Sequence, residues 1–292
     1  MARKDRHYAY LAGLIDGEGN IGVYRCKNQK GYWGYSINLS VSNKDKRLMN
    51  YLIKHFGGSF KPGTRSFNWE PHGGKERIKS LLLSVLDSLI IKKEQAKLCL
   101  SFIDLGNKII PDIRENFYFK SKILNSGSSK SIGLMHNTKS DFSYLAALID
   151  GEGSLRIIKT KQYNANGYCY HKVINITNCS RALMEYLVLH FGGIFKPKHS
   201  ANENYIPAFR WTIFGNEIQE NLLLAILPYL ILKKQEANLI LQFIRLDSKV
   251  NQEAREDLYQ QFQKLYQPLS PETNTPETSL EVKIESELHG NM

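Results

Sequence analysis

The sequence predicts an α+β protein made of two tandem, pseudo-symmetric copies of one unit, each with its own antiparallel sheet. Three observations support this fold class. Four blocks recur in the same order, so that residues 11–19, 46–62, 66–73 and 82–103 match residues 145–153, 181–197, 208–215 and 223–244. Segments in which apolar and polar residues alternate predict half-buried strands. Pairs of glycines close a helical segment that follows those strands in each copy.

Within each copy the predicted order of elements is α-β-β-α-β-β-α. A helix runs into the first matching block, with Asp5 and Ser140 as the expected N-caps of the two copies. In the first copy, strands over residues 20–28 and 36–43 precede a helix over 46–56. Two short strands, 59–61 and 66–69, come before the final helical part of the unit, which is predicted in two pieces over 76–89 and 93–105. Such a unit places its helices on one face of a sheet.

The duplication divides the chain of 292 residues into four segments. The first repeat is predicted over residues 1–111 and the second over residues 140–266. Residues 112–139 are charged and rich in Ser and Gly, which predicts a linker. Residues 267–292 form an acidic tail rich in Pro, Ser, Thr and Glu, which we expect to be disordered.

The charge of the chain indicates a polyanionic partner. The whole chain carries +11, and because residues 268–292 contain five Glu and one Lys, the remainder is more basic still. A basic body with interleaved Tyr and Trp is typical of nucleic-acid binding. No apolar run approaches the roughly 20 residues of a membrane-spanning helix. The four cysteines form no CxxC pair, so neither a zinc site nor a disulfide framework is expected.

The block LAGLIDGEG at residues 11–19 and its match LAALIDGEG at 145–153 place small residues one helical turn apart. Small residues at this spacing allow two helix backbones to approach closely. Such packing would bring Glu18 and Glu152 together, and two adjacent carboxylates repel unless a cation lies between them. Hard oxygen ligands suit Mg²⁺, and metal ions of this kind assist phosphodiester hydrolysis. The small residues expected at the contact are Gly13, Gly17, Ala147 and Gly151.

These two motifs resemble those of the LAGLIDADG homing endonucleases in their single-chain, two-repeat form. The resemblance spans roughly residues 5 to 110 and 140 to 250 and implies a saddle of two antiparallel sheets that binds DNA. It implies that Glu18 and Glu152, at the eighth motif position, bind divalent metal together with the carbonyls of Gly17 and Gly151. Asp16 and Asp150 would be structural. The chain departs from the commoner pattern by carrying Glu rather than Asp at the eighth position.

Two further pairs of residues resemble positions of that family. Lys92 and Lys233 take the place of a lysine at the start of the last core helix, close to the metal. An ammonium there would orient a hydroxide or stabilise charge on the phosphate, and the alternative interpretation is an ordinary solvated helix end. Asn43 and Asn178, at the end of the second strand of each copy, resemble the polar residue that holds active-site water.

Alternation along the strands predicts which side chains face DNA. If the odd-numbered residues of the first strand face the helices, the even-numbered ones face outward, where they would enter the major groove. The outward faces of the two copies differ, which predicts a target of two unlike half-sites. The predicted DNA-binding residues are Tyr24, Asn28, Asn38, Ser40, Lys61, Asn68, Arg156, Thr160, Asn175, Lys196, Arg210 and Thr212.

We therefore expect a monomeric, site-specific double-strand DNA endonuclease that depends on Mg²⁺, with Mn²⁺ as a substitute, and cleaves a long asymmetric target. The resemblance further implies an intron-encoded enzyme that promotes intron mobility. The alternative is a maturase that binds the host intron RNA, with or without residual cleavage. A transcription factor on the same fold ranks last, because such proteins generally lose the acids. The Lys-, Ile- and Asn-rich composition predicts a chloroplast or mitochondrion as the site of synthesis and action, with the bacterial cytoplasm as the alternative.

Overall fold

The computed structural model describes residues 3–27, 31–106, 110–126, 141–161, 168–198, 207–246 and 252–266, with side chains from Arg6 onward. None of the helices in these ranges is long and apolar enough to span a bilayer. The first repeat contains α1 (Arg3–Glu18), β1 (Gly19–Lys27), β2 (Trp33–Asn43), α2 (Lys46–Phe56), β3 (Ser59–Pro62), β4 (Phe67–Glu70), α3 (Gly74–Val85), α4 (Lys93–Asp104) and α5 (Pro111–Asn125). The second contains α6 (Phe142–Glu152), β5 (Gly153–Lys161), β6 (Tyr168–Asn178), α7 (Arg181–Phe191), β7 (Ile194–Lys198), β8 (Ala208–Ile213), α8 (Asn216–Ile226), α9 (Lys234–Arg245) and α10 (Gln252–Lys264).

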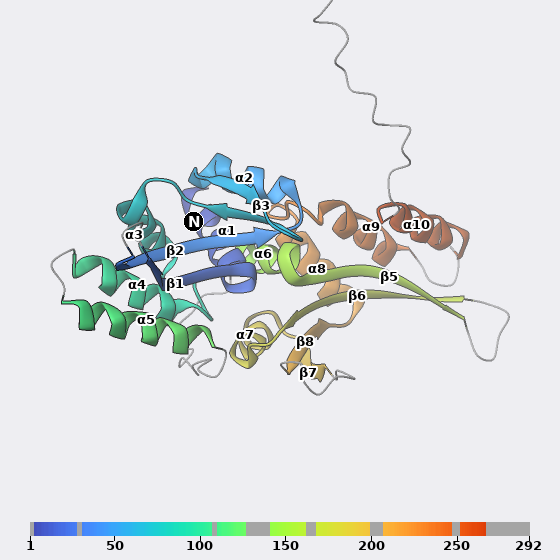
Figure 1. Cartoon of the computed structure of the whole chain (residues 1–292). Helices are drawn as coiled ribbons and strands as arrows, with labels where there is room; N and C mark the ends of the chain where they lie inside the picture. The colour runs from blue at the N-terminus through green and yellow to red at the C-terminus, as the bar shows by residue number, and fades with distance from the viewer. Residues whose placement is uncertain are drawn as a thin grey trace, which may run out of the picture.

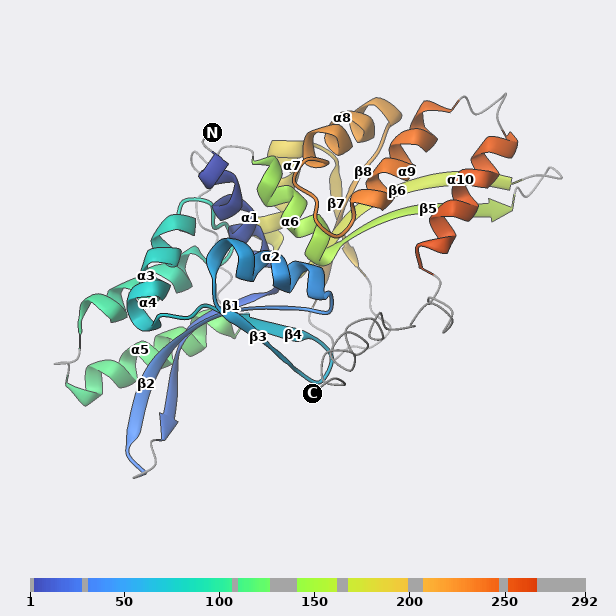
Figure 2. The ribbon, with the colours of Figure 1, turned by 90° about the horizontal axis from the view of Figure 1, so that it is seen from above.

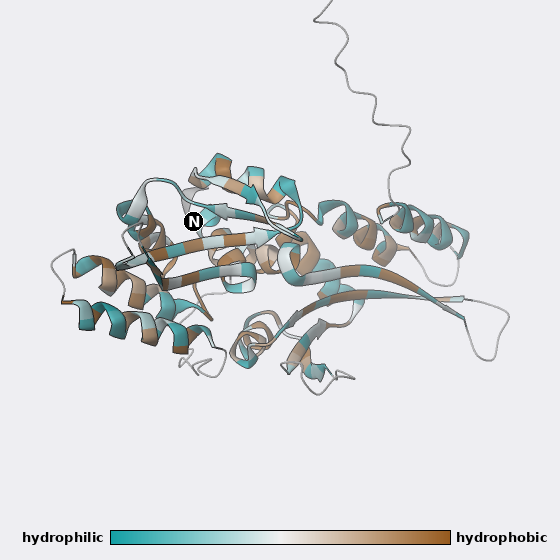
Figure 3. Ribbon diagram, in the orientation of Figure 1, coloured by the Kyte–Doolittle hydropathy of each residue, from teal (hydrophilic) through white to brown (hydrophobic). Residues whose placement is uncertain are grey.

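Each repeat holds one four-stranded antiparallel sheet, ordered β1-β2-β4-β3 in the first and β5-β6-β8-β7 in the second, which confirms the predicted fold class. The two registers correspond, since Ile21 pairs with Leu39 and Leu155 pairs with Ile174, and all four side chains are buried. Apolar and polar residues interleave along the long strands (Figure 3). The helices cover the apolar face of each sheet, and the other face is left open. α1 and α6 lie at the centre, and the two sheets extend away from them on either side (Figures 1 and 2).

A buried tryptophan ties each sheet to the end of a helix. The indole nitrogen of Trp69 donates to the carbonyl oxygen of Gly57 at 2.8 Å, and Trp211 donates to Gly192 at the same distance. Gly57 and Gly192 have φ angles of 70° and 75° and end α2 and α7, as the glycine pairs predict. A residue with a side chain is disfavoured in this left-handed region.

Two predicted boundaries are corrected by local hydrogen bonds. α3 ends at Val85 instead of continuing to residue 89. The chain must leave the helix there, because the amides of residues 90–92 donate to the carboxylate of Asp16. The N-cap of α6 is Asp141, whose carboxylate accepts hydrogen bonds from the amides of Ser143 and Tyr144. The predicted N-cap Ser140 lies outside the described residues, as does the side chain of Asp5.

The predicted linker over residues 112–139 is wrong in its first half, which forms most of α5. This helix lies along β1, the edge strand of its sheet. The Ser121 hydroxyl accepts a hydrogen bond from the Val23 amide at 2.9 Å, and the Asn125 amide donates to the Ile21 carbonyl at 3.0 Å. α5 thus satisfies backbone groups that an edge strand would otherwise leave unpaired.

The second repeat ends in α10, which takes the place that α5 has in the first. The observed unit is therefore α-β-β-α-β-β-α-α-α rather than the predicted α-β-β-α-β-β-α. Residues 127–140 and the predicted tail, 267–292, lie outside the described residues.

The two repeats meet chiefly along α1 and α6, which run in the same direction. A Cβ atom added to Gly13 would lie 2.5 Å from the Tyr144 carbonyl oxygen and 2.8 Å from the Ala147 Cβ. The interface therefore has room for the methyl group of Ala147, but not for a methyl group on Gly13 as well. A Cβ atom on Gly17 would have Leu148 Cδ2 as its nearest neighbour at 3.6 Å, which is an ordinary contact. The closest approach of the backbones depends on Gly13.

Gly13→Ala is expected to destabilise the protein by about 1–3 kcal/mol, the usual cost of overpacking. This loss should appear even though Ala is the better helix former by about 1 kcal/mol. Gly17→Ala is the matched control and should leave the free energy of unfolding unchanged or raise it by up to about 1 kcal/mol. Urea unfolding of both variants measures the difference, and equal effects of the two substitutions would contradict the role given to Gly13.

Candidate active site

Glu18 and Glu152 come together at the C-terminal ends of the motif helices, immediately before the first strand of each sheet. Each carboxyl group lies against the glycine of the opposite helix. A Cβ atom on Gly151 would be 3.4 Å from Glu18 Cδ, and one on Gly17 would be 3.7 Å from Glu152 Cδ. The two carboxylates therefore cross the interface between the repeats, and one site is built from both copies of the motif.

An asparagine holds each of these carboxylates in place. Asn43 Nδ2 donates to Glu18 Oε2, and Asn178 Nδ2 donates to Glu152 Oε2, both at 2.6 Å. The asparagine oxygens are themselves fixed, because they accept the amides of Asp45 and Ser180 at 2.8 Å. Because the oxygen of each asparagine already accepts a backbone amide, its nitrogen is the atom that faces the glutamate, and only this nitrogen can donate to a carboxylate. Asn43 and Asn178 thus orient the acids directly.

The pair of carboxylates fits a hard divalent cation. Burial raises the pKa of Glu18, although the Asn43 hydrogen bond and the charges of Lys233, Lys44 and Lys92 act in the opposite direction. A cation between the two acids would compensate both for their burial and for their mutual repulsion. Within the described ranges no group of three or more His, Cys, Asp or Glu side chains could hold a metal ion. Mg²⁺ tolerates such a site because it binds through one or two carboxylates and keeps water and phosphate in its shell.

Lys92 and Lys233 lie beneath this site, where their ammonium groups cap the motif helices. Lys92 Nζ donates to the carbonyl oxygens of Ile15, Asp16 and Gly19 at 2.6, 3.0 and 2.8 Å. Lys233 repeats the arrangement with the carbonyl oxygens of 149, 150 and 153. The last carbonyls of a helix lack amide partners and carry its negative dipole end, so a cation is favourable there. Burial lowers the pKa of Lys233, which the nearby carboxylates of Asp150, Glu236 and Glu18 oppose.

The other motif acids, Asp16 and Asp150, are buried structural acceptors. Asp16 accepts the three amides of residues 90–92, and Asp150 accepts those of residues 231–233. Each also accepts a hydroxyl from the opposite repeat, Tyr144 to Asp16 at 2.8 Å and Tyr10 to Asp150 at 2.7 Å. These bonds dock the loop that carries each lysine onto the motif helix. They also link the two repeats reciprocally.

The open faces of the two sheets carry most of the predicted DNA-binding residues. Two contacts on the first sheet agree with the assignment of faces, since Ser42 Oγ donates to Asn68 Oδ1 at 2.9 Å and Asn38 Nδ2 donates to Ser40 Oγ at 3.3 Å. Ser40 is nevertheless only 4% exposed, too buried to make a contact of its own. Asn28 lies outside the described residues. The strand registers place on the open faces Tyr24, Asn38, Lys61, Asn68, Arg156, Thr160, Asn175, Lys196, Arg210 and Thr212.

His171 was missed by the sequence prediction. It pairs with Ile158 across the strands, and its Nε2 atom lies 3.1 Å from the hydroxyl of Thr160. Both partners belong to the open face. Counting back by two from Val173 along β6 would have placed His171 on this face, because side chains alternate strictly along a strand.

The sequence prediction also missed an acid that braces each long hairpin from its helix-covered side. Glu115 on α5 forms an ion pair with Arg25 at 2.6 Å and accepts a hydrogen bond from Tyr35. The second repeat has the same arrangement on α10, with Glu256, Lys159 and Tyr170. A signal existed in the sequence, because RENFY at 114–118 matches REDLY at 255–259 at the spacing of the preceding matched block.

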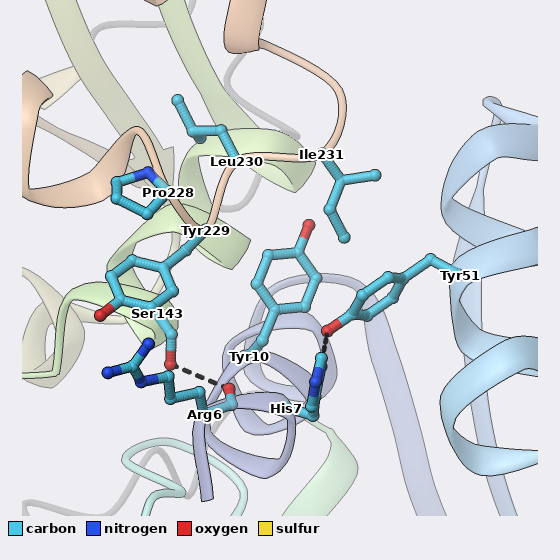
Figure 4. Close-up of a pocket in the computed structure, with 9 residues that line it drawn as sticks. All are labelled: Arg6, His7, Tyr10, Tyr51, Ser143, Pro228, Tyr229, Leu230 and Ile231. Carbon is cyan, nitrogen blue, oxygen red and sulfur yellow. Dashed lines mark hydrogen bonds between the residues drawn. The ribbon is translucent and has the colours of Figure 1, made fainter. Parts of the chain in front are cut away.

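A pocket of about 250 Å³ lies at the opposite end of the motif helices (Figure 4). Tyr10 stands at its centre, and His7 Nδ1 lies 2.7 Å from the hydroxyl of Tyr51. Ser143 Oγ donates to the backbone carbonyl of Arg6 at 3.0 Å, which joins the two repeats at this end as well. The helical rise of 1.5 Å per residue separates Arg6 from Glu18 by roughly 18 Å. The pocket is therefore distinct from the paired glutamates.

Lys233→Met is expected to lower the free energy of unfolding by about 1.5–3 kcal/mol, the usual contribution of hydrogen bonds to charged groups. Met retains most of the aliphatic chain and removes the donors to the three carbonyls. The neighbouring Lys234 is exposed and serves as the matched control. Lys234→Met should change stability by no more than about 0.5 kcal/mol. Chemical denaturation of both variants tests the cap, which equal stabilities would rule out.

Tyr144→Phe is expected to cost about 1.5–3 kcal/mol, because it removes the hydroxyl that Asp16 accepts in the buried interface. The ring and its packing remain, so the loss reports the hydrogen bond alone. Tyr8→Phe on α1 is the control, since no hydrogen bond of the Tyr8 hydroxyl is found among the described residues. Thermal and urea unfolding measure both variants. A neutral Tyr144→Phe would show that the bond does not hold the repeats together.

Comparison with known proteins agrees with this architecture. Residues 11–103 match the family model described as LAGLIDADG endonuclease, and no curated protein matches the chain. The fold is similar to that of the I-SmaMI LAGLIDADG homing endonuclease bound to cleaved DNA, with a TM-score of 0.63, 19% identity and coverage of 89% of this chain and 98% of the other. I-SmaMI bound to an uncleaved DNA target in the presence of calcium ions gives a TM-score of 0.65, 21% identity and coverage of 88% and 98%. The LAGLIDADG homing endonuclease I-GzeII in complex with its DNA target gives a TM-score of 0.61 and 15% identity, with coverage of 87% of this chain and 97% of the other.

The matches to solved structures extend over both repeats, whereas the family model covers the first repeat alone. In the second repeat the same motif, LAALIDGEG, occupies the equivalent helix and delivers the equivalent acid to the interface. The motif helices, their crossed glutamates and the paired sheets are thus present in both halves of one chain. Both repeats therefore have the fold of the LAGLIDADG homing endonucleases, and residues 11–103 match the LAGLIDADG endonuclease family model.

Proposed function

We propose that this protein is a site-specific, double-strand DNA endonuclease that uses Mg²⁺, for which Mn²⁺ substitutes. The observation that carries the proposal is the crossed pair of carboxylates, each lying against the glycine of the opposite motif helix. The pair lies at the ends of α1 and α6, from which β1 and β5 start, and the two sheets extend from these helices on either side (Figure 2). A duplex lying over both open faces would therefore pass it. Because one chain supplies both halves of the site, we propose that it acts as a monomer.

Each residue of the site has a distinct task in this proposal. Glu18 and Glu152 would hold the metal, with the carbonyls of Gly17 and Gly151 as further oxygen donors. Bound Mg²⁺ would supply positive charge beside the scissile phosphate. Asn43 and Asn178 fix the direction of the carboxylates through their 2.6 Å hydrogen bonds. Lys92 and Lys233 hold the helix ends that position both acids, and their charge beside the site would favour an anionic phosphate.

Double-stranded DNA is supported as the substrate by charge and by related folds. The chain carries +11 overall, and the solved structures of I-SmaMI and I-GzeII that resemble it contain DNA. The open faces of the two sheets differ in side chains although their strand registers correspond. This difference supports a long target with two unlike half-sites.

The alternative function is that of an intron RNA-splicing maturase. The carboxylate pair favours cleavage, because RNA binding alone would require neither acid. A splicing assay on the host intron, with and without the protein, separates the two functions. The resemblance of the motifs and the Lys- and Asn-rich composition support an intron-encoded protein of an organelle, with the bacterial cytoplasm as the alternative.

Glu18→Gln combined with Glu152→Gln is expected to abolish Mg²⁺-dependent cleavage while DNA binding persists. The loss should exceed the roughly 10- to 100-fold that removal of an outer-shell partner of a metal typically costs. The target is first selected as the cleavable fraction of a randomised duplex library. Plasmid linearisation measures cleavage, and a mobility shift with the same duplex measures binding.

The matched control is Glu185→Gln, because Glu185 is an exposed acid on α7 whose ion-pair partner among the described residues is Arg181. This control should cleave like the parent protein. Cleavage that survives in the double variant would refute the metal assignment. Failure of the parent protein to cleave any duplex, together with protein-dependent intron splicing, would favour the maturase.

A further inference from the structure

The open faces of the two sheets differ at four equivalent positions. In the second repeat these positions carry Ile158, Val173, Ile194 and Phe214, which we call the apolar patch. In the first repeat they carry Tyr24, Asn38, Ser59 and His72. The equivalence follows from position, since Tyr24 and Ile158 are the sixth residues of β1 and β5, and Asn38 and Val173 are the sixth residues of β2 and β6. Only the second repeat is apolar at all four.

The local contacts at these positions also differ. In the first repeat Ser59 Oγ lies at hydrogen-bonding distance, 2.8 Å, from His72 Nε2. In the second repeat the equivalent Ile194 and Phe214 line a pocket of about 440 Å³ together with Thr212 and Arg210. Ile158, Ile194 and Phe214 are 41%, 45% and 56% exposed. Apolar side chains this exposed on a sheet face are available to a partner.

The surroundings of the apolar patch identify the kind of partner. Arg156, Lys196 and Arg210 stand on the same open face, and the described strands β5–β8 place no Asp or Glu there. Exposed cations interleaved with apolar groups match a ligand that presents negative charge and small apolar groups together. The major groove of DNA is such a ligand, because phosphates border it and the 5-methyl group of thymine is the apolar group on its base edges.

We propose that the apolar patch selects thymine in the half-site bound by the second repeat, through contacts of Ile158, Val173, Ile194 and Phe214 with thymine 5-methyl groups. This inference rests on the proposed function and extends it, by naming the base chemistry that distinguishes the two half-sites. The first repeat presents hydroxyl, amide and imidazole groups at the equivalent positions, so it reads bases by hydrogen bonds. Arg156, Lys196 and Arg210 fix the phosphates on either side and contribute affinity.

The test replaces thymidine by deoxyuridine in the selected target, one half-site at a time. Deoxyuridine keeps every hydrogen-bonding group and lacks only the 5-methyl group. Burial of one methylene-sized group is worth about 0.8 kcal/mol, or roughly fourfold in Kd. We expect a loss of about that size for each contacted thymine in the half-site of the second repeat, and no loss in the other half-site. Fluorescence anisotropy measures Kd, and single-turnover cleavage measures the rate.

A double variant, Ile158→Thr with Ile194→Thr, completes the test. Thr keeps the β-branched shape that strands favour, so circular dichroism should report an intact fold. The double variant should bind the thymidine and the deoxyuridine duplex with the same Kd. That Kd should equal the one that the parent protein shows for the deoxyuridine duplex. Leu189→Thr, which removes a more exposed aliphatic side chain from α7, should retain the sensitivity of the parent protein.

Three outcomes would overturn the proposal, and they are distinguishable. Cleavage that proceeds equally well with thymidine and deoxyuridine in the second half-site refutes the inference and leaves the endonuclease intact. Concentration-dependent dimers in sedimentation velocity, lost in the double variant, would assign the apolar patch to a second copy of the chain. Absence of any cleavable duplex removes the endonuclease and the inference with it.

Discussion

The structure depends on the direct contact between α1 and α6. Because Gly13 presents no side chain, the backbone of α1 reaches the Tyr144 carbonyl and the Ala147 methyl group. The same approach sets the distance between the two ends of the helices, where Glu18 and Glu152 lie. The lysine caps, the asparagines and the first strand of each sheet are all attached to those ends. A small residue near the middle of a helix therefore determines the geometry of a site one turn further along.

Neither repeat satisfies its own buried acid without the other. Asp16 takes its fourth donor from Tyr144, and Asp150 takes its fourth from Tyr10. A buried carboxylate that loses a donor is costly, because the low dielectric strengthens the penalty for an unpaired charge. The two repeats are thus coupled by polar bonds in addition to apolar packing, and they should unfold together. These cross-repeat bonds also help to align the two glutamates. Each of the two aspartates, Asp16 and Asp150, binds both a tyrosine of the other repeat and the loop that carries a lysine of its own repeat.

Sequence reasoning succeeded where the signals are local or repeated. Period-two strands identified the covered and open faces, and the two copies of the motif indicated that Glu18 would meet Glu152. It failed where partners are distant in sequence and carry no pattern. The ammonium of Lys92 caps carbonyls of α1, and no spacing in the sequence predicts that geometry. The composition of residues 112–139 predicts a linker, whereas Ser121 and Asn125 of α5 bond to the free edge of β1. No sequence pattern identifies the backbone of an edge strand as a partner.

The strict alternation of side chains along the strands has an evolutionary consequence. Residues of the covered faces, such as Ile21 and Trp69, are locked into the cores, and their loss would leave cavities. Residues of the open faces are free of that requirement, and substitutions at such positions usually alter stability by no more than about 0.5 kcal/mol. A lineage can therefore move to a new target by single steps while each intermediate protein stays folded. Because the two repeats have separate open faces, one half of the recognised sequence can change while the other keeps the protein anchored to its old site.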